Sequence, residues 1–468
     1  MTDITTANSH VESEFTHDGE QWRDLKGVKV WRAGTLVYYK KDLIRLFFWL
    51  FLGQFTFWMQ AIAIPMLFPL LCKIKGFSAG EIGTLWSMMP LVATFLVPVL
   101  GVMSDHTRSR FGRRRPYDLF TTPFWFLGLL WLPFTNSYWE AMVAMSLVAF
   151  AGAGSSVLTA FYNDVVPPEL MGRFSAGKQF LSSTGALICQ WGVMRIFESY
   201  PELIFVAIAT IGFVGEMLML FFVKEGTYPA PPPNQNIIKL AFSFTKDGFA
   251  NRYIIYLWLT MGVTAFGGPV MGTYFSLYFT DKLGYTTGQL GMLMGIGTVI
   301  GLCLIIPAGW VVDSWGPKRL WSWCGALVGL VQIAMYFLAK DLFSITILFS
   351  LYAAINTMLT ASLMPVLYSF IPKDKFGQLN GSNSIVSNVL SIIAMSSIGW
   401  VITLTANPVT GEENYSVLFL FGGAAYLLTP VFMWLMLKQP YPYGDLKPSM
   451  NPDGNRASRK QTSIMDKA

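Results

Sequence analysis

Long apolar runs, separated by short polar segments, dominate the chain from residue 44 to residue 437. Each run holds about 20 mostly apolar residues, the length that an α-helix needs to cross the hydrocarbon layer of a membrane. The twelve runs span residues 44–72, 83–104, 117–136, 138–162, 174–197, 203–223, 253–280, 288–312, 320–339, 342–370, 378–405 and 416–437. Helices are the expected form, because backbone groups in lipid must bond within their own segment.

The composition agrees with this pattern. The 468 residues are 53% hydrophobic and 13% charged, whereas soluble domains carry about 25% charged residues. The four cysteines show no metal or disulfide spacing, and the three histidines lie outside the apolar runs, so we expect no metal and no cofactor. The sequence predicts an all-α membrane protein with twelve transmembrane helices, and not an enzyme.

Polar segments divide the chain into five parts. Residues 1–42 and 438–468 form tails, residues 43–223 and 253–437 form two pseudo-symmetric six-helix bundles, and residues 224–252 form a linker. The linker starts Pro-rich and continues into an amphipathic segment, which we expect to lie along the membrane surface. Fourteen Lys and Arg residues lie in loops on the side of the tails and five on the opposite side. The positive-inside rule therefore places both termini of this multi-pass cell-membrane protein in the cytoplasm.

Three loop motifs occur twice, in the same order. The pairs are 76–83 with 284–291, 101–115 with 309–319, and 166–175 with 371–380. The first pair reads GFSAGEIG and GYTTGQLG, and the second places Gly, three residues and Asp before a Gly and a basic cluster. A duplicated unit of six helices keeps matching loops on the same side, so we expect two parallel repeats related by an axis along the membrane normal.

This architecture resembles the major facilitator superfamily, whose loop signature is Gly-x-x-x-Asp followed by Gly and basic residues. The resemblance covers nearly all of residues 43–437. The segment SDHTRSRFGRRRP (104–116), with GQFTFW (53–58) and Pro65, is similar to the glycoside–pentoside–hexuronide cation symporter family, and closest in pattern to its sucrose-transporter-like branch. The resemblance implies a monomeric secondary transporter that carries a saccharide by alternating access, with a proton or sodium ion as the usual driver.

The arginine-rich stretch RSRFGRRR (108–115) lies in a short loop between two predicted spans, which argues against a nucleic-acid partner. The matched loops carry charges of both signs on the predicted cytoplasmic side. We expect ion pairs there that form when a cytoplasmic gate closes and break when it opens; a static loop network is the alternative. The predicted gating residues are Asp105, Arg113, Arg114, Glu169, Asp313, Arg319 and Asp374.

Polar residues follow helical spacing at matching positions of the fifth and eleventh runs. Because a polar face in lipid is costly, we expect these faces to line a shared cavity between the repeats; hydrogen bonds between helices are the alternative. Other candidates combine amide or hydroxyl groups with flat aromatic faces. The predicted solute-binding residues are Gln54, Trp58, Gln60, Tyr162, Asn163, Gln179, Ser182, Gln190, Asn356, Ser384 and Asn388.

Coupling to an ion requires titratable groups, and the last six runs contain no Asp, Glu, Lys, Arg or His. The predicted coupling residues are therefore Glu216, which lies deepest, with Asp164 and Asp118. Melibiose-type symporters resemble one another in carrying acids within their second and fourth helices. The second run here has none, so proton-coupled or uncoupled transport is favoured over sodium coupling.

The expected function is transport of a sugar or glycoside across the membrane, with the lipid bilayer as its surroundings and a proton as the favoured ion. Two alternatives stay open. One is transport of another organic solute, such as a peptide or a cell-wall fragment. The other is a receptor with the same fold that binds a solute without moving it.

Overall fold

The computed structural model describes residues 15–17, 22–24, 28–229, 237–238, 242, 248–249, 251–372 and 376–442. Contacts divide the chain into two compact units. Unit 1 consists of Met1–Ile62, Phe95–Ala186 and Glu202–Ala241, and unit 2 of Ala63–Thr94, Leu187–Pro201 and Phe242–Ala468. The first six predicted spans are divided between the two units. The described residues of the last six spans all lie in unit 2.

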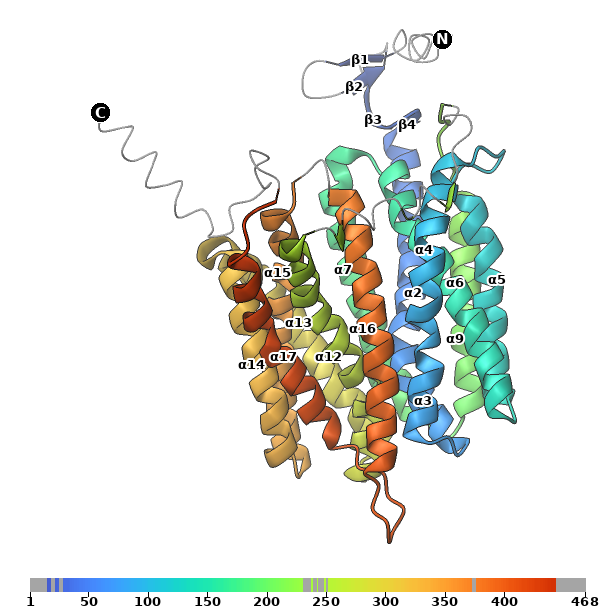
Figure 1. Cartoon of the computed structure of the whole chain (residues 1–468). Helices are drawn as coiled ribbons and strands as arrows, with labels where there is room; N and C mark the ends of the chain where they lie inside the picture. The colour runs from blue at the N-terminus through green and yellow to red at the C-terminus, as the bar shows by residue number, and fades with distance from the viewer. Residues whose placement is uncertain are drawn as a thin grey trace, which may run out of the picture. The chain divides into compact units, whose positions relative to one another are not determined.

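Helices occupy all twelve apolar runs, in the predicted order (Figure 1). The first six segments are α2 (Lys40–Ile74), α3 (Ala79–Trp86) with α4 (Met88–His106), α5 (Arg115–Trp131) with η1 (Leu132–Phe134), α6 (Tyr138–Val165), η2 (Pro168–Leu170) followed by α7 (Met171–Ile188) with η3 (Cys189–Val193) and α8 (Met194–Ile196), and α9 (Pro201–Phe222). The others are α12 (Arg252–Leu277) with η4 (Tyr278–Lys282), α13 (Thr287–Trp315), α14 (Pro317–Leu338), α15 (Leu342–Phe370), α16 (Phe376–Leu404) and α17 (Val417–Leu437).

Ten of these segments are long and apolar enough to cross a membrane, among the residues that the structure describes. The two remaining segments are α5, which has 17 residues, and α7, which carries the polar stripe of the fifth run. The twelve-helix prediction is confirmed as a helical fold. The amphipathic segment predicted within 224–252 lies mostly outside the described residues.

The duplication is visible in the way that matching helices begin. Ser78 caps α3: its hydroxyl accepts from the Glu81 N–H, and the Glu81 carboxylate accepts from the Ser78 N–H. Thr286 and Gln289 make the same two bonds at the start of α13. This capping box satisfies two N–H groups that a helix start otherwise leaves unpaired. Both copies of the motif therefore form the same local structure.

Glycines at matching loop positions adopt the same unusual backbone conformation. Gly76 and Gly284 have φ of +83° and +71°, and Gly112 and Gly316 have φ of +110° and +84°. Positive φ is costly for residues with a Cβ atom, so these sites favour glycine. The two loop motifs therefore encode tight turns that redirect the chain between helices.

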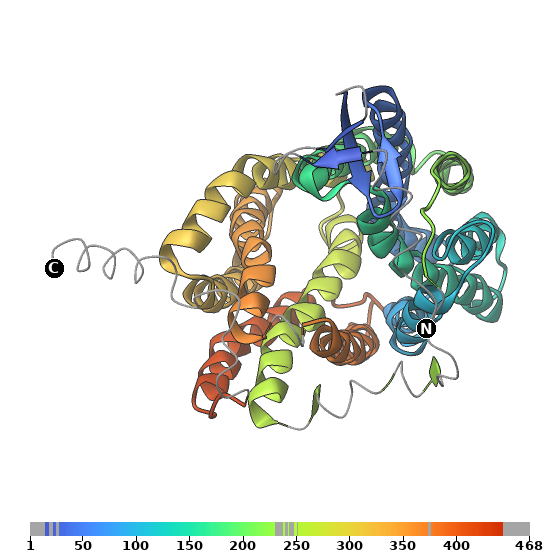
Figure 2. The ribbon, with the colours of Figure 1, turned by 90° about the horizontal axis from the view of Figure 1, so that it is seen from above.

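A small antiparallel sheet lies within residues 15–38, where the sequence predicts only a polar tail. Its strands are β1 (Phe15–His17), β2 (Trp22–Asp24), β3 (Lys29–Ala33) and β4 (Leu36–Tyr38), paired in that order. Gly34, with φ of +58°, forms the β3–β4 turn with Thr35. In Figure 2 the strands lie beside the start of α2. Trp31 of β3 and Leu36 and Tyr38 of β4 pack against the unit 1 core that α2, α6 and α9 build.

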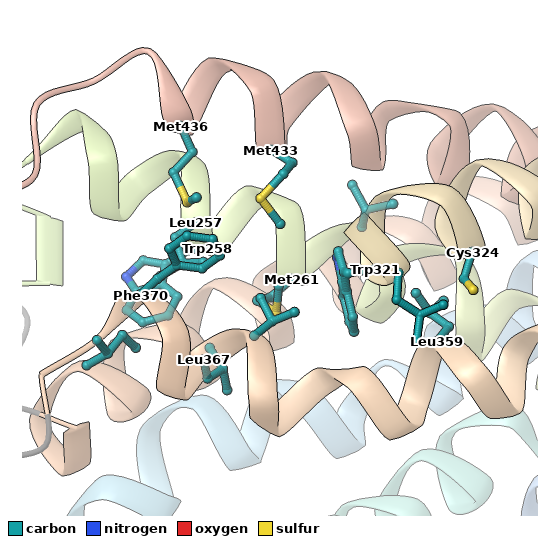
Figure 3. Packing of buried hydrophobic residues seen from close by; sticks show 14 of the residues in the cluster. Leu257, Trp258, Met261, Trp321, Cys324, Leu359, Leu367, Phe370, Met433 and Met436 are labelled. Atoms are coloured by element: carbon teal, nitrogen blue, oxygen red, sulfur yellow. The ribbon is translucent and has the colours of Figure 1, made fainter. Parts of the chain in front are cut away.

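Unit 2 has a core of large side chains from α12, α14, α15 and α17 (Figure 3). Trp258 and Trp321 are 0% and 1% exposed, and Met261 and Met433 fill the space beside them. Lipid tails are as apolar as these side chains, so close packing rather than exclusion from water holds such helices together. Small residues at crossings are therefore important to the fold.

Gly83 marks such a crossing, between α3 and α16. A Cβ atom there would overlap the Met395 carbonyl oxygen and the Tyr274 hydroxyl. We expect Gly83→Ala to destabilise the protein by about 1–3 kcal/mol, the usual cost of overpacking. Melting of the purified protein in detergent measures this. Gly309→Ala is the matched control, because a Cβ on that helical glycine meets no atom within 4 Å. Equal melting temperatures for the two variants would contradict the prediction.

Candidate functional site

Three of the predicted solute-binding residues form one hydrogen-bonded group in unit 1. The Gln54 side-chain amide donates to the Tyr162 hydroxyl, and Trp58 Nε1 donates to Gln54 Oε1 at 3.1 Å. Gln54 and Trp58 are four residues apart on α2 and so share a face. Gln54 is 2% exposed and Tyr162 4% exposed. The group joins α2 to α6, and Trp58 is its half-buried end.

Gln60 is held in a separate contact. Its side-chain oxygen accepts from Trp125 Nε1 on α5 at 2.6 Å, and the side chain is 2% exposed. Gly212 on α9 leaves the space for it, since a Cβ at that position would coincide with the amide. Sequence patterns gave no indication of Trp125, because its partner lies 65 residues away on another helix.

The remaining solute-binding candidates are dispersed over the two units. Asn163, Gln179 and Ser384 are exposed, Asn356 and Asn388 are half-buried, and Ser182 is buried. Gln190 is also buried, and its Oε1 accepts from Thr298 Oγ1 at 2.9 Å, between η3 and α13 of unit 2. Gln190 therefore makes a hydrogen bond between helices, which was the alternative to a place in a solute cavity.

The three predicted coupling acids lie in two places of unit 1. Asp118 on α5 and Glu216 on α9 are 2% and 5% exposed, and their carboxyl groups lie within hydrogen-bonding reach of each other. Asp164, at the end of α6, instead meets two of the arginines predicted for gating. No group of three or more His, Cys, Asp or Glu side chains that could hold a metal ion occurs among the described residues.

Asp105, Arg113, Arg114 and Asp164 form the Asp164 cluster in unit 1. Asp164 contacts Arg113 at 2.7 Å and Arg114 at 2.5 Å, and Asp105 lies 3.0 Å from Arg114 and 3.8 Å from Arg113. Burial opposes the charge of Arg113, but the hydrogen bond and the charge of Asp164, together with Tyr228 and Asp105, outweigh it and raise the pKa of the guanidinium. The cluster ties the loop before α5 to the end of α6.

Glu225 completes this loop and was not predicted. Its carboxylate accepts from the backbone N–H groups of Arg113, Arg114 and Arg115, the last at 3.0 Å. These are unpaired donors at the start of α5, where a negative charge is also favoured by the helix dipole. The Tyr228 ring lies 4.0 Å from the Arg113 guanidinium, and burial raises the pKa of its phenol to about 12. Glu225 follows α9 by chain order, so no spacing rule links it to α5.

Three other predicted gating residues make no ion pair among the described residues. Glu169, Asp313 and Arg319 are exposed, and their side chains make no ion pair with any residue whose placement is described. Asp374 lies outside the described residues. Their role in gating stays a prediction.

Lys73, Asp281, Glu413 and Tyr415 form the Glu413 cluster in unit 2. Glu413 accepts from Lys73 Nζ at 2.8 Å and from the Tyr415 hydroxyl at 2.5 Å, and Asp281 lies 3.8 Å from Lys73. It also accepts from the Ala79 N–H at 2.8 Å, at the start of α3. Burial alone would raise the pKa of the Glu413 carboxyl, but the Lys73, Tyr415 and Ala79 hydrogen bonds lower it.

Further bonds within unit 2 join the two repeats near this cluster. The Tyr274 hydroxyl donates to the Ala79 carbonyl at 2.9 Å, and the Ser87 and Ser396 hydroxyls lie 3.0 Å apart. At a second contact, between the start of α13 and the residues after α8, the Thr287 N–H donates to Glu198 at 2.7 Å. The ends of α2, α3 and α8 are thus fastened to α12, α13 and α16. None of these bonds was predicted, because each joins positions 89 or more residues apart.

Asp164 offers a direct test of the Asp164 cluster. We expect Asp164→Asn to lower the free energy of unfolding by about 1.5–3 kcal/mol, since two largely buried guanidinium groups lose their charged acceptor. Thermal melting in detergent measures the change. Glu169→Gln is the control, because that exposed carboxylate lies in the neighbouring turn. A melting temperature for Asp164→Asn within error of the control would show that the cluster contributes no stability.

The sequence profile described as Major Facilitator Superfamily matches residues 46–395. The isoprimeverose transporter of Lactiplantibacillus pentosus is 31% identical over 123 residues, 25% of this chain and 26% of that protein. The inner membrane symporter YicJ of Escherichia coli is 23% identical over 289 residues, 56% of this chain and 60% of that protein. These two alignments therefore span less than two thirds of either relative.

Among solved structures, a D-xylose-proton symporter superposes with a TM-score of 0.63 at 17% identity, over 86% of this chain and 99% of that one. At this identity the likeness concerns the fold alone. The profile match, by contrast, covers most of the chain, including both copies of the first two repeated loop motifs and the eleventh helix up to Met395. The chain belongs to the Major Facilitator Superfamily, and its helices are those of a multi-pass membrane protein.

Proposed function

We propose that the protein moves a sugar or glycoside across the cell membrane by alternating access, with a proton as the coupled ion. Both termini lie in the cytoplasm in this proposal, and the protein acts as a monomer of the glycoside–pentoside–hexuronide symporter branch. The observation that carries it is the 31% identity to an isoprimeverose transporter over 123 residues. The similarity to a protein named as a symporter supports coupled transport.

The Gln54, Trp58 and Tyr162 group supports a saccharide as the solute. An indole face and an amide within one hydrogen-bonded set offer both contacts that a sugar ring uses, apolar C–H faces and hydroxyl groups. Trp58 is half-buried at the edge of this group and is the member that a solute reaches first. Gln54 and Tyr162 then hold the indole in place.

The Glu413 cluster is the proposed outer gate. Its residues lie at the ends of α2 and η4 and in the loop before α17, on the side opposite the predicted cytoplasmic tails. Its bonds join the first repeat to the second. Alternating access requires such bonds to break when the solute path opens to the outside. Lys73 is 36% exposed, so its ion pair with Glu413 is weak enough to break in every cycle.

Uptake into proteoliposomes tests the function. We expect purified protein to concentrate radiolabelled isoprimeverose when an inward proton gradient is imposed, and to lose this accumulation when an ionophore collapses the gradient. Protein-free liposomes and a labelled dipeptide are the controls. Solute binding without uptake would instead show a receptor, and dipeptide uptake would show a different solute class.

Glu413→Gln tests the outer gate. We expect Cys72, which is 1% exposed next to Lys73, to react faster with a membrane-impermeant maleimide, because the charged acceptor of Lys73 is lost. Mass spectrometry of the labelled peptides measures this, with Cys324 in the unit 2 core as an internal reference. Glu412→Gln, at the exposed neighbouring position, is the matched control. Equal labelling of Cys72 in both variants would refute the gate.

Glu413→Gln should also change how the melting temperature of the protein depends on pH. A carboxyl group whose pKa is lowered in the folded protein contributes stability above its ordinary value of about 4.3, and this contribution is lost as the pH falls through the lowered value. The melting temperature of the wild type should therefore drop more steeply in acid than that of Glu413→Gln. Parallel curves would show that Glu413 makes no favourable interaction.

A further inference from the structure

Two acids, Asp118 and Glu216, are buried inside unit 1, and no basic side chain forms an ion pair with them among the described residues. Neither oxygen of Asp118, nor Oε1 of Glu216, has a hydrogen-bond donor among the residues that the structure describes. The two carboxyl groups lie within reach of each other. An ionised carboxylate only accepts hydrogen bonds, so a bond between two carboxyl groups requires a proton on one of them.

None of the charged groups around the pair makes a hydrogen bond or ion pair to it among the described residues. Arg115, one turn before Asp118 on α5, donates through Nη2 to the Leu220 and Phe221 carbonyl oxygens, while its buried Nε has no acceptor among the described residues. Lys178 on α7 lies 5.6 Å from the centre of the Tyr162 ring, and Tyr162 on α6 accepts from Gln54 on α2. Asp164 and Glu225 bind the arginine loop.

No described cation therefore pairs with the carboxyl pair, and two bare negative charges at this depth would carry a large desolvation cost. A shared proton removes one charge and supplies the missing donor in one step. The pair has the chemistry of a proton-binding site rather than of a structural ion pair.

We propose that Asp118 and Glu216 together hold one exchangeable proton, and that this is the proton coupled to solute movement. The inference rests on the proposed transport function. A proton from water binds one carboxylate, and the resulting acid donates to the other carboxylate. Release returns the proton to water and leaves two like charges, which favours opening of the site.

The path from the pair to the solute group is short. The Tyr162 hydroxyl lies 3.8 Å from the Met219 sulfur, one helical turn after Glu216 on α9, and it accepts from Gln54. Gln54 in turn holds Trp58. A change in charge at the pair acts on the Tyr162 hydroxyl through a water-poor interior, where electrostatic interactions are strong. Binding of the proton can thus alter how Trp58 is presented to a saccharide.

The experiment compares Asp118→Asn, Glu216→Gln and the double variant in proteoliposomes, with Glu202→Gln as control. Glu202 is an exposed acid in the first turn of the same helix, α9. We expect the single and double variants to lose accumulation of isoprimeverose driven by a proton gradient but to keep exchange of labelled for unlabelled isoprimeverose at equal pH. The control should do both. The single variants should melt near the wild type because the new amide can donate to the remaining carboxylate, and the double variant because one amide can donate to the carbonyl oxygen of the other.

A second measurement does not depend on transport. Infrared spectra of the reconstituted protein, recorded across a pH series without solute, should show a protonated-carboxyl band that titrates in the wild type and in Glu202→Gln. The band should be lost in the two single variants. A wild type that moves no solute but shows this band would overturn the transport proposal and leave the proton site standing.

Three results would overturn the proton site itself. The first is unchanged proton-driven accumulation in both single variants. The second is an infrared titration that these variants leave unaltered. The third is wild-type accumulation driven by a sodium gradient at equal pH, which would show that a metal cation and not a proton is coupled.

Discussion

The main constraint on this structure is the free-energy cost of burying a polar group that has no hydrogen-bond partner. Helices satisfy the backbone groups, and several described acids between helices have a fixed partner. Asp164 forms ion pairs with two arginines. Glu413 accepts hydrogen bonds from a lysine, a tyrosine and the first N–H group of α3. Glu225 accepts from N–H groups at the start of α5. Asp118 and Glu216 are the contrast, since neither oxygen of Asp118, nor Oε1 of Glu216, has a donor among the described residues.

Features that repeat locally were predictable from the sequence. Apolar length located all twelve helices, and α15 was predicted with the bounds that it has, Leu342–Phe370. The repeated GFSAGEIG and GYTTGQLG segments became identical capping boxes, because Ser or Thr followed three residues later by Glu or Gln determines the bonds of a helix start. The positive φ of Gly112 and Gly316 follows from the same kind of local rule.

Contacts between distant segments were not predictable in the same way. Glu225 and Glu413 lie in ordinary loops, and only the three-dimensional path brings them to α5 and α3. The polar stripe of the fifth run gave the right residues to examine, but periodicity does not say whether Gln190 meets a solute or another helix; here it meets Thr298. The β3–β4 hairpin was hidden for a related reason, since strands this short carry little periodic signal.

The two ion clusters differ in which repeats supply their residues, and so in how motion of the repeats would affect them. Every described partner in the Asp164 cluster comes from the first repeat, so its bonds persist if that repeat moves as one body. The Glu413 cluster joins residues 73–79 of the first repeat to residues 281–415 of the second, so relative motion of the repeats must break it. The Asp164 cluster is therefore suited to hold the first repeat together as a rigid body. The Glu413 cluster is suited to set the free energy that relative motion of the two repeats requires.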